Sequence, residues 1–184
     1  MKNNKRFMTV LMVIMFGLSF VLPGLISPQV AEAASTYSVI SVPALQANMP
    51  GQNLGVIQVD VPNCAAITSG DVLTVSLPSG ITMAAPGPAV VTDIPGPDNG
   101  TSIVIPTMAG GNPNGLRPEA IQSAIVGPTR NSLDITFTGI ANPDPGRLFI
   151  YISGVTVGAI DGDIVAYLLG PANSGFSTGS VVVG

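Results

Sequence analysis

Residues 132–138 read Ser-Leu-Asp-Ile-Thr-Phe-Thr, a strict alternation of polar and apolar side chains. Successive side chains of a β-strand point to opposite faces of a sheet. This period of two therefore predicts a strand that turns Leu133, Ile135 and Phe137 inward and leaves its polar residues outward. A segment of this kind needs a second apolar layer above it, so the pattern favours a fold in which sheets pack on sheets.

The same pattern returns along the chain between turns rich in Gly, Pro, Asn and Asp. Residues 147–157 predict one long strand, and apolar residues on both of its faces favour a central position. Residues 118–125 are the only stretch that favours a helix, with Pro118 in its first turn. The other predicted strands cover residues 37–42, 54–61, 71–77, 102–105, 164–169 and 176–183, with short candidates at 81–83 and 90–91. We therefore expect an all-β, antiparallel β-sandwich, jelly-roll or immunoglobulin-like, with about eight or nine strands and at most one short helix.

The first 33 residues have the composition of a signal peptide. Lys2, Lys5 and Arg6 precede a long apolar run, and small residues at 31 and 33 flank Glu32. This arrangement predicts export and cleavage after Ala33, with a retained membrane anchor as the alternative. The mature protein would then be a single domain, residues 34–184, in which residues 34–42 are a candidate donated strand.

The mature part of the chain is acidic and poor in charge. It holds three arginines and nine acidic residues, which gives a net charge of −6, and it contains no Lys, His or Trp. Nucleic acids and anionic membranes are bound by clustered basic residues. We therefore expect no nucleic-acid partner, and no membrane partner after cleavage. Such a low charge also indicates either a surface rich in Ser, Thr, Asn and Gly or a surface covered by other subunits.

The residue inventory argues against catalysis. Without His or Lys, acid–base chemistry would depend on paired carboxylates, and the acidic residues lie mostly in turns. The pair Asp161 and Asp163 offers too few oxygens for calcium, so a turn is the better interpretation. Asn99 begins a glycosylation triplet, which is weak evidence by itself. Cys64 stands among apolar neighbours, which favours a buried thiol over an intermolecular one. We expect no catalytic, cofactor-binding or metal-binding residues.

Two short segments, one toward each end of the mature chain, resemble exported β-modules of Firmicutes. They are residues 70–78, Gly-Asp-Val-Leu-Thr-Val-Ser-Leu-Pro, and residues 175–183, Gly-Phe-Ser-Thr-Gly-Ser-Val-Val-Val. The resemblance implies a bacterial cell-surface module of the kind found near copper amine oxidase-like stalk domains or in surface-layer proteins. It does not imply copper or oxidase chemistry, because the mature chain has no His to bind the metal.

Three functions fit these observations to different degrees. The first is a secreted structural subunit that forms an extracellular filament or surface layer with copies of itself, through β-strand complementation or edge pairing. The candidate contact strand carries Tyr37, Val39, Ile40 and Val42. The second is a monomeric module that binds cell-wall glycan or another polysaccharide as an adhesin. A secreted hydrolase is the last choice.

Overall fold

The computed structural model describes residues 34–93, 100–106, 114–172 and 174–184. The described residues are almost entirely β-structure and include no α-helix. The predicted signal peptide, residues 1–33, lies outside them. The strands are β1 (Thr36–Val39), β2 (Met49–Gln52), β3 (Ile57–Val61), β4 (Val72–Ser76), β5 (Ile81–Thr82), β6 (Gly87–Pro88), β7 (Val90–Thr92), β8 (Thr101–Val104), β9 (Ile121–Val126), β10 (Ser132–Phe137), β11 (Gly146–Ile152), β12 (Val155–Val157), β13 (Val165–Leu169) and β14 (Gly179–Val182).

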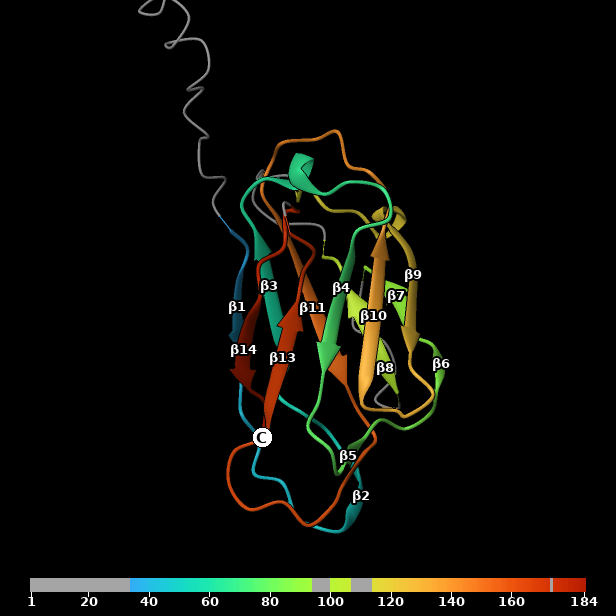
Figure 1. Ribbon diagram of the computed structural model, residues 1–184, viewed down its shortest axis with the longest axis vertical. Helices are drawn as coiled ribbons and strands as arrows, with labels where there is room; N and C mark the ends of the chain where they lie inside the picture. The colour runs from blue at the N-terminus through green and yellow to red at the C-terminus, as the bar shows by residue number, and fades with distance from the viewer. Residues whose placement is uncertain (1–33, 94–99, 107–113, 173) are drawn as a thin grey trace, which may run out of the picture. The chain divides into compact units, whose positions relative to one another are not determined.

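Two large sheets face each other across a shared core (Figure 1). One sheet has five strands in the order β1-β3-β11-β8-β7, and the other has six in the order β14-β13-β4-β10-β9-β6. All pairings in them are antiparallel except that of β7 with β8. The prediction that residues 147–157 contribute a central strand is confirmed for β11, which has β3 on one side and β8 on the other.

The alternating segments turn their apolar residues inward as predicted. Leu133, Ile135 and Phe137 of β10 are buried, and the same holds for the alternate residues of β3 and β4. The rings of Phe137 and Phe176 pack with their centroids 4.7 Å apart. Burial of such side chains contributes about 1.5–3 kcal/mol each, so this shared core is the main stabilising feature of the fold.

The predicted strand over residues 147–157 is in fact two strands. The backbone of Gly154 has φ = 70°, a left-handed conformation that glycine tolerates, and the chain bends there. Beyond the bend, β12 joins a third, three-stranded sheet in the order β2-β12-β5. Its strand β2 occupies a Pro/Gly segment that lies outside the strands predicted from the sequence.

The predicted helix over residues 118–125 is wrong. Pro118 begins a short 3-10 turn, η3 (Pro118–Ala120), and the residues that follow form β9. This strand pairs with β10 on one side and β6 on the other, so sheet hydrogen bonds outweigh the local helix propensity. The count of eight or nine strands is also wrong, because the described residues contain fourteen strands in three sheets.

The two lateral sides of the paired sheets are built differently. On one side a single short segment contributes β6 to the six-stranded sheet and β7 to the five-stranded sheet, and it contains Pro88. On the other side β1 and β14, the outermost strands of the two sheets, lie next to each other (Figure 1). The first and last described strands therefore meet at one margin of the fold.

Candidate functional site

The four residues of the predicted contact strand fall into two groups. Tyr37 and Val39 are half-buried and pack against the core of their own domain. Ile40 and Val42 follow the end of β1 and are 59% and 54% exposed, respectively. The structure thus places all four on one continuous stretch, but only the last two offer apolar surface to another molecule.

The start of β1 is fastened to the segment that leads into β14. Ser35 is buried, and its Oγ accepts a hydrogen bond of 2.8 Å from the Ser177 backbone N–H. The Tyr37 hydroxyl donates to the Ser177 carbonyl oxygen at 2.5 Å, and the Ser177 hydroxyl donates to the Ser35 carbonyl oxygen at 2.8 Å. The Tyr37 ring lies over Gly179, where an added Cβ would stand 2.7 Å from its Cδ2 atom. This network holds the first strand within its own domain.

The far edge of β1 has no pairing partner among the described residues. The Ile40 N–H donates to the Val56 carbonyl oxygen at 3.1 Å, so Ile40 and Val56 form one of the hydrogen-bonded pairs of this antiparallel ladder. Because antiparallel pairs alternate, Thr36 and Ser38 also direct their backbone groups toward β3. The N–H and C=O groups of Tyr37 and Val39 consequently point to the open edge, where another strand could pair.

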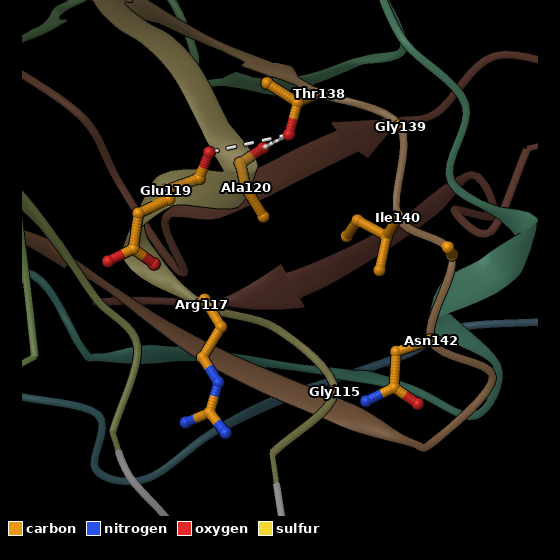
Figure 2. Close-up of a pocket in the computed structure, with 9 residues that line it drawn as sticks. Gly115, Arg117, Glu119, Ala120, Thr138, Gly139, Ile140 and Asn142 are labelled. Carbon is orange, nitrogen blue, oxygen red and sulfur yellow. Dashed lines mark hydrogen bonds between the residues drawn. The ribbon is translucent and has the colours of Figure 1, made fainter.

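A shallow hollow of about 340 Å³ lies at η3 and the loop after β10. Figure 2 shows Arg117 and Glu119 on one side of it, with Ile140 and Asn142 on the loop. The Thr138 hydroxyl crosses to the Ala120 carbonyl oxygen at 3.3 Å. The residues that line this hollow include one carboxylate, that of Glu119, and no Cys, His or Lys. The hollow therefore brings together neither a nucleophile with a base nor two facing carboxylates.

The described acidic residues have structural partners or stand in exposed turns. Asp71 accepts a 2.8 Å hydrogen bond from the Thr68 N–H, and Asp134 accepts one of 2.7 Å from the Thr74 hydroxyl. Asp161 and Asp163 flank Gly162, whose φ of 93° marks a tight turn. The described ranges contain no group of three or more His, Cys, Asp or Glu residues that could hold a metal ion. Asn99, of the glycosylation triplet, lies outside them.

The prediction that Cys64 is buried is confirmed. Cys64 is fully buried and lies within the short 3-10 turn η2 (Cys64–Ala66). Burial, and secondarily the negative charge of Asp144, raises the pKa of the thiol to about 11. Because the thiolate is the reactive form, this cysteine is poorly suited to nucleophilic chemistry or disulfide exchange near neutral pH.

Three aromatic residues lie on the outward faces of the large sheets. Tyr167 is 53% exposed on the outer face of the six-stranded sheet. Phe149 and Tyr151 occupy alternate positions of β11 whose side chains lie opposite the buried set, and both are only half-buried. Aromatic residues at positions i and i+2 within an apolar strand were the available signal.

Comparisons with known proteins leave the family open. No family model matches the chain, and no curated protein is similar to it. Among solved structures, a similar chain comes from "Complete structure of manganese lipoxygenase of Gaeumannomyces graminis and partial structure of zonadhesin of Komagataella pastoris". It is 15% identical with a TM-score of 0.31, over 85% of this chain and 57% of that one, a likeness too low to support an argument. We also find no helical segment among the described residues with the length and hydropathy to span a bilayer. The resemblance to Firmicutes surface modules therefore stays a prediction.

Proposed function

We propose that this protein is an exported, non-catalytic structural subunit that assembles with copies of itself into an extracellular filament or surface layer. The observation that carries the proposal is the open edge of β1, followed at once by exposed Ile40 and Val42. An unpaired edge offers backbone hydrogen bonds to a second strand, and adjacent apolar side chains add burial when that strand arrives.

The contrast between the two lateral sides supports this assignment. Monomeric β-proteins protect their edges with very short strands, proline or charged residues. The β6–β7 side has short strands and Pro88, whereas β1 and β14 contain no charged residue and no proline. The side formed by the first and last strands is therefore the one that lacks protection.

Two modes of assembly use this margin. In edge pairing, β1 of one copy adds a strand to the open edge of another. In strand donation, residues 34–42 leave their own domain and pair with β3 of a neighbour, which would reproduce the contacts of Tyr37 and Ser35 between two chains. Residues 43–48, which follow the donated segment and are mostly exposed, would serve as the hinge.

A matched pair of proline variants tests the proposal. Val39→Pro removes an N–H that points to the open edge, so it should leave the fold intact and abolish edge pairing. Ser38→Pro removes an N–H that points to β3, so it should loosen β1 itself. Val39→Ala controls for the lost side chain, and Ile40→Lys with Val42→Lys adds charge to the apolar segment. Sedimentation and negative-stain microscopy of residues 34–184 would measure assembly.

The outcomes separate the two modes and can refute both. Loss of assembly in Val39→Pro supports edge pairing. Assembly that survives Val39→Pro, but is lost when residues 34–42 are deleted, supports donation. A wild-type protein that stays monomeric at high concentration would refute the proposed function.

We also assign the two large sheets to a β-sandwich of the jelly-roll or immunoglobulin-like kind. What supports this is their face-to-face packing over one core and their nearly all-antiparallel pairing. The three-stranded sheet is then an addition at one end, formed by the continuation of β11 into β12.

A further inference from the structure

The outward face of the five-stranded sheet carries aromatic and polar side chains in register. Across β1, β3 and β11, one row is Thr36, Asp60 and Arg147. The next row is Ser38, Gln58 and Phe149, and Tyr151 stands two residues farther along β11. These positions come from three strands, but the sheet brings them onto one surface.

The polar side chains of this face are already fixed by hydrogen bonds to one another. The Arg147 Nε atom donates to the Asp60 Oδ1 atom, and the Gln58 Nε2 atom donates to Oδ2 of the same carboxylate at 2.6 Å. The Arg147 and Asp60 side chains remain 38% and 32% exposed. The Nη groups of Arg147 and the Oε1 atom of Gln58 have no hydrogen-bond partner among the described residues, so donors and an acceptor remain available to a ligand.

The backbone of Arg147 is also fixed, by the side chain of a buried residue. Asn114 is buried, and its side chain bonds to both the N–H and the C=O of Arg147, each at 2.9 Å. A side chain that is positioned before binding loses less conformational entropy when a ligand arrives. The site is thus preorganised on a rigid central strand.

The aromatic residues extend the surface along β11. Arg147, Phe149 and Tyr151 occupy alternate positions, so they form a line of about 13 Å at the usual rise per residue of a strand. Half-buried rings on a sheet face offer apolar area with little conformational freedom to lose. A line of this length suits an extended ligand better than a single small molecule.

We propose that this face binds a neutral polysaccharide. The rings of Phe149 and Tyr151 pack against the apolar faces of sugar units, while Arg147 and Gln58 bond to sugar hydroxyl groups. The charges of the face indicate a neutral ligand. The charges of Asp60 and Arg147 cancel, and the other residues of these rows are uncharged. An acidic polymer would be repelled by the Asp60 carboxylate and by the net charge of −6 on the mature chain. The inference goes beyond the proposed assembly and does not depend on it.

Affinity electrophoresis of residues 34–184 tests this inference, since this unit contains all the described strands and the core. The neutral probes are hydroxyethylcellulose and glycol chitin, polygalacturonate is the acidic comparison, and gels without polymer correct for assembly. We expect the neutral probes to retard the protein. Phe149→Ala or Tyr151→Ala should weaken binding about two- to tenfold, the range expected for one aromatic contact. Tyr167→Ala, which removes an exposed tyrosine from the other sheet, is the matched control and should leave binding unchanged.

Two further variants protect the test against misfolding. Tyr151→Phe keeps the ring and should bind nearly as well as wild type, while Gln58→Ala removes a half-buried side chain that bonds to Asp60 and should weaken binding. Val39→Pro, which blocks edge pairing, should still be retarded by the neutral probes and lose only the avidity that assembly adds, so failure of one proposal is distinguishable from failure of the other. Absence of retardation by both neutral probes, or an equal loss in Tyr167→Ala, would overturn the inference.

Discussion

Replacing Asn114 by alanine should destabilise the protein more than any surface substitution of the same kind. The Asn114 side chain is 1% exposed. Its Nδ2 group donates to the carbonyl oxygens of Pro106 and Arg147, each at 2.9 Å. Its Oδ1 atom accepts from the N–H groups of Arg147 at 2.9 Å and Leu116 at 3.2 Å. All four hydrogen-bonding positions of the amide are therefore in use.

The cost follows from the groups that lose their partner. A buried N–H without an acceptor costs about 1–3 kcal/mol, and Asn114→Ala leaves two of them. The two carbonyl oxygens add less, because each has a second lone pair and water can enter the space vacated by the amide. The free energy of unfolding should fall by about 3–5 kcal/mol, a large part of the 5–15 kcal/mol typical of a domain.

Urea denaturation followed by circular dichroism is the suitable assay, because the chain has no tryptophan. Asn142→Ala is the matched control: Asn142 is exposed and, among the described residues, its side chain accepts a single hydrogen bond, from the Asp144 N–H at 3.0 Å, so its loss should cost about 0.5–1 kcal/mol. Asn114→Asp adds a second test, since it places acceptor oxygens against the carbonyl oxygens of Pro106 and Arg147. We expect it to be at least as damaging as alanine. If Asn114→Ala and Asn142→Ala differ by less than about 1 kcal/mol, the reasoning about a saturated buried amide is wrong.

Three further predictions follow from the core and the first strand. Because the pKa of the Cys64 thiol is raised to about 11, the unfolded thiol ionises first as the pH rises. The free energy of unfolding should fall by up to about 2.7 kcal/mol between about pH 9 and about pH 11, and Cys64→Ala should remove this fall in urea titrations at several pH values. Gly179→Ala should displace the Tyr37 ring and cost about 1–3 kcal/mol, with a changed tyrosine signal in near-ultraviolet circular dichroism; an unaltered spectrum would contradict the contact. Phe137→Ala should cost about 3–5 kcal/mol through the cavity it leaves beside Phe176, and a thermal melt no lower than that of the outward-facing Phe149→Ala would refute this.

The two proposals use adjoining surfaces of the same domain. Assembly uses the margin where β1 and β14 meet, whereas glycan binding uses the outward face over β3 and β11, which continues onto Thr36 and Ser38 of β1. Since the edge of β1 and the face of its sheet point in different directions, a copy that pairs along the edge does not have to cover Phe149. A filament or layer built this way would present many weak glycan sites in parallel, and multivalency raises avidity without new contacts.

Strand content was predictable because side-chain alternation is a local property. Leu133, Ile135 and Phe137 show the period of two without any knowledge of their neighbours, and each proved buried. Cys64 was placed correctly for a similar reason, since its adjacent residues are apolar. The predictions failed where local preference and pairing disagree, as in residues 118–125, which were predicted to be helical and instead contribute most of β9, a strand that lies between two partners.

The open edge of β1 was predictable only in part. The sequence indicated an uncharged first strand, but which side of β1 lacks a partner depends on its pairing with β3. The glycan face was not predictable, because Gln58 and Asp60 lie about 90 residues from Arg147 along the chain and meet it only through strand register.

The all-β character of the chain, the inward faces of its clearest strands and the low charge of residues 34–184 can be read from the sequence alone. These properties depend on residue type and on spacing within a few positions. Strand pairing, the edges that remain open and the polar side chains that meet emerge only in the folded arrangement. Those outcomes depend on contacts between residues far apart in the chain, where hydrogen-bond register and core packing select one arrangement among many that share the same local pattern.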